Sequence, residues 1–155
     1  MEGARSSGNN CLFDCSTNAE SVLISACLLG IPCRWHGRRP KRREKLIERL
    51  KKRYVLVPVC PEQLGGLPTP RVGADLVGGD GHDVLAGNAR VITRSGEDVT
   101  RNFILGANQV LKIARQLEVT KLFLKAGSPS CGIKPNIGVT AALLKQTGFE
   151  VVEMD

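Results

Sequence analysis

Three cysteines that lie far apart in this sequence are its strongest candidates for chemistry. They are Cys27, Cys60 and Cys131. Three thiolates suit a metal centre that keeps one coordination position open. Such a centre is either a catalytic zinc ion or a 4Fe-4S cluster in which one iron stays free to bind a substrate sulfur. The spacing does not choose between them, because the sequence has no C-x-x-C pair and no compact cysteine run of the ferredoxin type.

The remaining cysteines are weaker candidates. Cys33 is the alternative to Cys27 as the first ligand, but Cys27 is better placed at the end of a predicted strand. Cys11 and Cys15 lie in a polar stretch and are expected to be exposed thiols. The even total of six cysteines also fits a disulfide scaffold. However, the first twenty residues contain no apolar signal segment, which favours a reducing compartment and metal ligands.

Two kinds of oxygen-bearing side chain lie beside the cysteines. Glu62 follows Cys60 by two residues, where a carboxylate can activate water or shuttle a proton. Ser128 and Ser130 precede Cys131, and their hydroxyls can hold a pyrimidine or a developing anion. The alternative functions are a loop cap for the carboxylate and ordinary turn chemistry for the two serines.

The predicted strands carry the three cysteines to one edge of a sheet. Cys27 and Cys60 fall at or directly after strand ends, and Cys131 lies in the loop after a third strand. Apolar runs predict these strands at 21–27, 54–59 and 121–125. Because helices are predicted between them, we expect an α/β fold with a largely parallel sheet flanked by helices. Ligands bind beyond the carboxyl ends of the strands in such sheets.

The other predicted elements complete this alternation. A long helix is expected to begin at Asp98 or Thr100 and to reach Leu117, with apolar residues at the helical period. Residues 61–81 are rich in Gly and Pro and predict an irregular loop. The remaining predictions are a helix at 42–53, a hairpin of 83–85 with 89–93, a helix at 138–146 and a strand at 149–153.

Length and composition indicate one domain. The chain has 155 residues, of which 42% are hydrophobic. Residues 1–20 are predicted to be a flexible N-terminal extension, and 21–155 the α/β domain. No apolar run is long enough to span a bilayer, so we expect a cytoplasmic protein without a membrane partner. The sequence gives no indication of oligomeric state.

The positive charge is concentrated in one segment. Residues 38–53 contain ten Lys or Arg and two Glu, in a chain whose net charge is +7. Such a segment can bind RNA phosphates, or it can be the solvated face of an amphipathic helix.

Several segments together resemble the thiouracil desulfidase family. The resemblance runs in order from about residue 22 to the last residue and implies a single Rossmann-like domain. It also implies a 4Fe-4S cluster and a non-redox conversion of a thiocarbonyl to a carbonyl with release of sulfide. The segments are ISACLLGIPCRWHG (24–37), VPVCPEQLGGLPTPR (57–71), GEDVT (96–100), LKAGSPSCG (124–132) and GVTAALL (138–144).

By the same resemblance, the cluster ligands are Cys27, Cys60 and Cys131. Glu62 and Ser128 become the acid/base and substrate-positioning residues. The free iron is expected to capture the thiocarbonyl sulfur of a small thiolated nucleobase as a Lewis acid, while Glu62 assists attack by water. Such a cluster is sensitive to oxygen, and the alternatives are a site that holds zinc or one that has lost its cluster on aerobic isolation.

This sequence departs from the family pattern at two places. His36 stands where an acidic residue is usual, and the segment 133–137 is shorter than usual.

Two other functions therefore stay open. The same cluster can act on thiolated RNA held by residues 38–53, or the domain can be a non-catalytic carrier of a cluster or of zinc. A thiol redox protein is disfavoured, because the C-x-x-C motif is missing.

Overall fold

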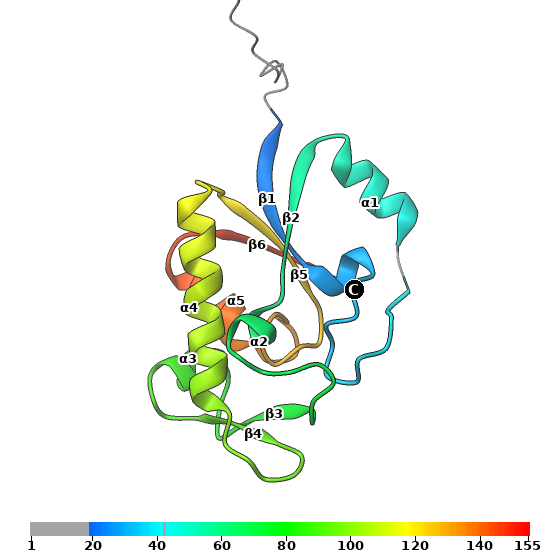
Figure 1. Cartoon of the computed structure of the whole chain (residues 1–155). Coiled ribbons are helices and arrows are strands. Elements are labelled where there is room, and N and C mark those ends of the chain that lie inside the picture. Colours follow the sequence, from blue (N-terminus) through cyan, green and yellow to red (C-terminus); the bar gives the residue numbers. More distant parts are fainter. Residues whose placement is uncertain (1–18, 42) are drawn as a thin grey trace, which may run out of the picture.

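A computed structural model describes residues 19–41 and 43–155, and Figure 1 shows how the elements are arranged. The predicted extension 1–20 lies outside the described residues except at its end, where Glu20 already belongs to a strand. The strands are β1 (Glu20–Ser25), β2 (Tyr54–Val59), β3 (Ala74–Val77), β4 (Arg90–Thr93), β5 (Lys121–Lys125) and β6 (Glu150–Met154). The helices are the 3-10 helix η1 (Ala26–Leu29), α1 (Glu44–Lys51), α2 (Pro61–Leu64), α3 (Gly81–Leu85), α4 (Thr100–Gln116) and α5 (Val139–Gln146).

Four parallel strands form the main sheet, in the order β2-β1-β5-β6. Parallel strands are usually covered on both faces and are therefore continuously apolar, as the buried Val22, Leu23 and Ile24 of β1 are. Pro58 is accommodated because β2 is an edge strand, where its missing N–H is tolerated. The prediction of an α/β fold with a largely parallel sheet is confirmed.

Helices cover the two faces of this sheet. On one face α4 and α5 pack on Leu23, Val59 and Leu122. On the other face Ile47, the buried residue of α1, packs on Val22 and its neighbours. In Figure 1 the long helix α4 and the short basic helix α1 stand on opposite sides of the strands. In the same view the small β3–β4 sheet lies below the carboxyl ends of β2 and β5.

The predicted hairpin of 83–85 with 89–93 is wrong. Residues 83–85 belong to α3, whose start is fixed by a capping box between Asp80 and Asp83. Strand β4 instead pairs antiparallel with β3, which comes from the segment predicted to be an irregular loop. This two-stranded sheet packs through Val91 against Phe103 of α4 and lies beside the main sheet.

Helix α2 is held against α4 by a close approach of two backbones. A Cβ on Gly106 would lie 1.9 Å from the carbonyl oxygen of Pro61, and one on Gly65 would lie 2.1 Å from the carbonyl oxygen of Asn102. The side-chain amide of Asn102 donates to the carbonyl of Gly65 at 2.9 Å. The position of α2 matters for function, because Glu62 lies in its first turn.

We expect Gly106→Ala to destabilise the protein by about 1–3 kcal/mol, because the added methyl group overpacks the contact of α4 with α2. Urea denaturation measures this change in the free energy of unfolding. Asn108→Ala, at an exposed position of the same helix, is the matched control and should change it by less than about 0.5 kcal/mol. Equal stability of the two variants would show that α2 is not tightly packed on α4.

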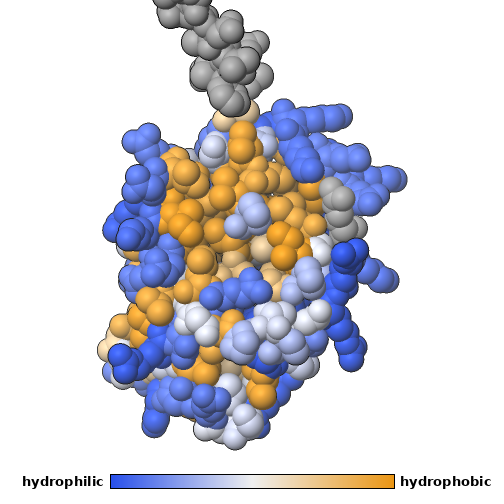
Figure 2. Space-filling view, viewed as in Figure 1, coloured by the Kyte–Doolittle hydropathy of each residue, from blue (hydrophilic) through white to orange (hydrophobic). Residues whose placement is uncertain are grey.

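One face of the molecule is apolar between α4 and α1. Figure 2 shows hydrophobic residues gathered there, in the part of the view where Figure 1 draws β1 and β2. Val55 of β2 is half exposed, as is Leu117 just after α4. No helix in the described part of the chain is long and apolar enough to cross a membrane. The expected cytoplasmic location stays a prediction.

Candidate functional site

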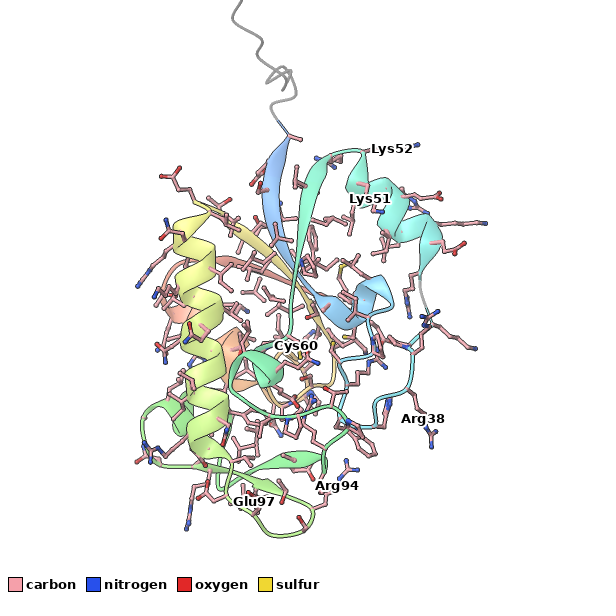
Figure 3. The ribbon with its side chains drawn as sticks, viewed as in Figure 1. Arg38, Lys51, Lys52, Cys60, Arg94 and Glu97 are labelled. Atoms are coloured by element: carbon pink, nitrogen blue, oxygen red, sulfur yellow. The ribbon has the colours of Figure 1, made fainter. Side chains whose placement is uncertain are left out.

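A cavity of about 270 Å³ lies at the carboxyl ends of β1, β2 and β5. Four cysteines line it, namely Cys27, Cys33, Cys60 and Cys131. They converge because Ser25, the last residue of β1, pairs with the last residue of β2, and its hydroxyl accepts the Lys125 amide hydrogen at the end of β5. Figure 3 shows Cys60 near the middle of the molecule, where β2 ends.

The sequence predicted that Cys27 ends a strand, and this prediction is wrong. Strand β1 stops at Ser25, and Cys27 lies in η1, which turns the chain back over the sheet edge. Cys27 and Cys33 are 7% and 3% exposed, and both pack with Cys60 and Ala26. The fold therefore brings Cys33 to the cavity together with Cys27, so the choice between them as ligand stays a prediction.

Cys131 is held by a tightly hydrogen-bonded loop after β5. The Ser128 hydroxyl accepts the Cys131 amide hydrogen at 3.2 Å, and the Ser128 carbonyl accepts that of Gly132 at 2.9 Å. The start of α5 supports the loop from behind, because the Thr140 amide donates to the Ser130 carbonyl at 2.9 Å. The Cys131 side chain is consequently buried and fixed in the cavity wall.

Arg71 holds the Glu62 carboxylate in place. Its Nε donates to Oε2 of Glu62 at 2.7 Å, and its Nη2 donates to the carbonyl of Cys33 at 3.1 Å. Its Nη1 donates to Thr69 Oγ1 and to the carbonyl of Pro68. The Arg71 and Glu62 side chains are only 7% and 15% exposed, so this ion pair is shielded from solvent.

The second oxygen of Glu62 begins a chain of hydroxyl groups. Ser130 Oγ donates to Oε1 of Glu62 at 3.2 Å, and Ser128 Oγ lies 2.9 Å from Ser130 Oγ. Because a carboxylate only accepts hydrogen bonds, Ser130 donates to Glu62 and Ser128 can then donate to Ser130. Ser128 thus reaches Glu62 only through Ser130, a residue that the predicted catalytic pair omitted.

The thiols around Cys33 influence one another. Hydrogen bonding from the Cys33 thiol lowers the pKa of Cys27 to about 6, with help from Arg34. The same thiol lowers the pKa of Cys60 to about 7, while the pKa of Cys33 itself is raised. Burial raises the pKa of Cys131 to about 12. Thiolates, the form that binds metals, are therefore favoured at Cys27 and Cys60.

Positive charge also lines the cavity. Lys125 reaches Asp155 at 2.8 Å, and Arg34 lies against Cys27. Nε of Arg34 is buried and has no hydrogen-bond partner in the described part of the chain. An unsatisfied buried donor costs roughly 1–3 kcal/mol, so this cavity wall is suited to an anionic acceptor.

The two departures from the family pattern lie at the edge of the cavity and on its supporting loop. His36 lines the cavity, and its Nδ1 accepts the Arg38 amide hydrogen at 3.0 Å. The short segment 133–137 is anchored because the carboxylate of Glu153 accepts the amide hydrogens of Ile133 and Lys134, which lowers the pKa of Glu153.

The basic segment 38–53 begins beside the site, where Lys41 and Arg43 line a second cavity with Cys27 and Arg34, and its helix α1 then leads away from it. Arg38, Lys51 and Lys52 point outward in Figure 3, and the two lysines lie at the far end of α1 from Cys60. RNA binding by this segment stays a prediction.

Comparison with known proteins identifies the chain. The model of the 2-thiouracil desulfurase family matches residues 22–155. The chain belongs to this family. The family resemblance predicted from the sequence is thereby confirmed, and the protein is an enzyme.

Two relatives extend this assignment. The uncharacterized protein YbbK of Bacillus subtilis (strain 168) is 41% identical over 145 residues, which cover 84% of this chain and 93% of YbbK. The solved structure of the 4Fe-4S-dependent thiouracil desulfidase TudS matches with a TM-score of 0.70 and 33% identity. That match covers 88% of this chain and 91% of TudS, and it confirms the fold class.

The residues of this desulfurase cavity fit an iron–sulfur cluster. Thiolates are the ligands that iron–sulfur clusters take, and four thiols surround the cavity. Within residues 19–41 and 43–155, no three His, Cys, Asp or Glu side chains meet closely enough to enclose a single metal ion. The four thiols line a cavity of about 270 Å³. The unpartnered Arg34 Nε would find an acceptor in an anionic cluster that fills this space.

Proposed function

We propose that the protein replaces the sulfur of a thiouracil-like pyrimidine by oxygen in a non-redox, cluster-dependent reaction. One observation carries this proposal. A largely shielded carboxylate, Glu62, is held by Arg71 in the wall of a cavity that also presents the cysteines. Membership of the 2-thiouracil desulfurase family and the likeness to the 4Fe-4S-dependent desulfidase TudS support the choice of substrate and cofactor.

Cys27, Cys60 and Cys131 would hold the cluster, with Cys33 as the alternative to Cys27. A 4Fe-4S cluster on three thiolates supplies an iron with an open coordination position, a Lewis acid that matches a soft thiocarbonyl sulfur. Arg34 and Lys125 contribute positive charge near the thiolates, which offsets the negative charge of the loaded site.

The oxygen of the product comes from water, and Glu62 is the base. The carboxylate takes a proton from the water whose oxygen bonds to the ring carbon, and the carbon–sulfur bond breaks. Overall, one thiocarbonyl and one water become one carbonyl and one hydrogen sulfide, so no electrons are gained or lost. The hydrogen bond from Arg71 fixes one carboxylate oxygen and leaves the other directed at Ser130.

The test is turnover of 2-thiouracil by protein reconstituted with iron and sulfide under anaerobic conditions. We expect uracil and sulfide to form in equal amounts, and the activity to disappear on exposure to air. If the reconstituted protein holds about four irons but releases no sulfide from thiouracil, the proposed reaction is wrong. If only zinc is retained, the proposed cofactor is wrong. Turnover restricted to thiolated RNA, with a steep salt dependence, would favour RNA as the substrate.

Ser130→Ala tests the hydroxyl chain. We expect kcat for thiouracil to fall roughly 10- to 100-fold. This fold-change corresponds to the free energy that is lost with one hydrogen bond to a charged group. Ser128→Ala should have a similar or smaller effect, because Ser128 reaches Glu62 through Ser130. Ser95→Ala, in the turn after β4, is the control and should leave kcat unchanged. A larger loss in Ser128→Ala than in Ser130→Ala would mean that Ser128 acts on the substrate directly.

A further inference from the structure

The cysteine cavity is lined by one exposed aromatic residue, Trp35, that does not belong to the proposed cluster ligands or to the hydroxyl chain. Trp35 lines the cavity, and 43% of its surface is exposed. It lies two residues after Cys33, on the loop that connects η1 to the basic segment. An indole offers a large, rigid and flat surface at a low cost in conformational entropy, which makes it an effective contact for a planar ligand.

The indole has two side-chain contacts, and the backbone of Trp35 has one hydrogen bond. The guanidinium of Arg94 lies over the ring, 5.1 Å from its centroid, and the imidazole of His36 approaches edge-on at 5.1 Å. The backbone carbonyl of Trp35 accepts the Arg71 amide hydrogen at 2.7 Å. These contacts restrict the ring before any ligand arrives, and preorganisation of this kind favours binding.

Arg94 lines the same cavity and has contacts with β3 and the residue before it. It ion-pairs with Asp75 at 3.6 Å, and its backbone amide donates to the carbonyl of Gly73 at 2.8 Å. A Cβ on Gly73 would lie 3.2 Å from Cζ of Arg94, so the glycine leaves room for the guanidinium. Figure 3 shows Arg94 next to the β3–β4 sheet, below Cys60 in this view.

Arg71 links this aromatic residue to the reactive carboxylate. Its backbone amide bonds to Trp35, while its side chain bonds to Glu62 and to the carbonyl of Cys33. The backbone of Trp35 and the carboxylate of Glu62 are therefore tied to the same residue, Arg71. A ring placed against Trp35 would lie in the same cavity as the carboxylate and the cysteines.

We propose that the pyrimidine ring of the substrate stacks on the face of Trp35 that Arg94 leaves free, and that Arg94 is a positioning residue for the indole. This inference rests on the proposed function, because it assumes a planar heterocyclic substrate. Stacking of a base on an aromatic side chain is tolerant of substituents, since every base has a π face. Trp35 therefore selects flat heterocycles, while the thiocarbonyl selects which of them react.

The test uses the cluster-loaded protein and the kinetic constants for 2-thiouracil. Loss of an aromatic platform typically weakens base binding roughly 5- to 150-fold, so we expect Trp35→Leu to raise KM by that factor with kcat little changed. Trp35→Phe should stay close to the parent. Leu117→Ala, at a similarly exposed residue away from the cavity, is the control. Iron content and the urea midpoint should be the same in all variants, which excludes misfolding.

Fluorescence gives a second readout that does not depend on turnover. Trp35 is the only tryptophan, so its emission reports binding at this position. Uracil, which does not react, should change the emission in a saturable manner, and Arg94→Ala should weaken this binding and lower the emission anisotropy. Saturable binding of uracil or thiouracil at Trp35 supports the inference even if no sulfide is released. The stacking inference is overturned if KM is unchanged in Trp35→Leu, or if neither uracil nor thiouracil changes the Trp35 emission. Turnover measured with the parent protein would not be affected by either result.

Discussion

Cys60→Ala is expected to abolish cluster binding. Cys60 directly follows β2, and its sulfur lies in the cavity wall beside Cys27 and Cys33. Loss of one of three thiolates leaves the cluster too few protein ligands to be retained. After anaerobic reconstitution, iron, acid-labile sulfide and visible absorption should fall to background, and thiouracil turnover should disappear with them. Cys131→Ala should behave in the same way, because its thiol approaches the cavity from the opposite loop.

The first ligand position is decided by comparing Cys27→Ala with Cys33→Ala. Both thiols are buried in the same cavity, and the resemblance to the desulfidase family assigns the ligand to Cys27. We therefore expect Cys27→Ala to lose the cluster and Cys33→Ala to retain iron. The opposite result would assign the ligand to Cys33. Retention of about four irons by Cys60→Ala, in protein with an unchanged urea midpoint, would refute the proposed ligand set.

The convergence of distant cysteines could be predicted because it depends on features that a sequence shows. Apolar runs predict strands, and the alternation with helices predicts that the strands are parallel. Parallel neighbours have their carboxyl ends at one edge, which brings Cys60 and Cys131 together although they are far apart in the chain. The exact end of β1 was missed because η1 continues the same apolar run past Ser25.

Contacts between loops could not be predicted in this way. Arg71 holds Glu62, Cys33 and Trp35 together from a Gly- and Pro-rich segment that shows no periodicity. The role of Ser130 likewise depends on which hydroxyl faces the carboxylate, and the SPSCG segment contains two candidates. Next to the wrongly predicted hairpin of 83–85 with 89–93, the sequence carries the acidic pair Asp80 and Asp83. This pair marks the start of helix α3 and not a turn.

Glu62→Gln should lower kcat for thiouracil by roughly 10²- to 10⁴-fold, the usual contribution of a general base. The amide keeps the size of the side chain. Its one carbonyl oxygen can still accept the hydrogen bond from Arg71, and its NH2 group can donate to the Ser130 hydroxyl, but the amide cannot take a proton from water. The cluster ligands are unaltered, so the iron content and the visible spectrum of the reconstituted variant should match the parent. Activity and cofactor content are thereby separated in one variant.

The matched control for this variant is Glu97→Gln, which removes the same charge at an exposed residue. Glu97 lies in the turn after β4, well away from Cys60 in Figure 3. Its substitution should leave kcat unchanged, so any general effect of net charge is accounted for. If Glu62→Gln keeps the parent kcat with a full complement of iron, water is activated by another group, and the Arg71–Glu62 ion pair only positions the Cys33 loop. In that case Arg71→Met should lower the free energy of unfolding, because the Cys33 loop loses its anchor. It should lower kcat only as far as the loss of folded protein explains.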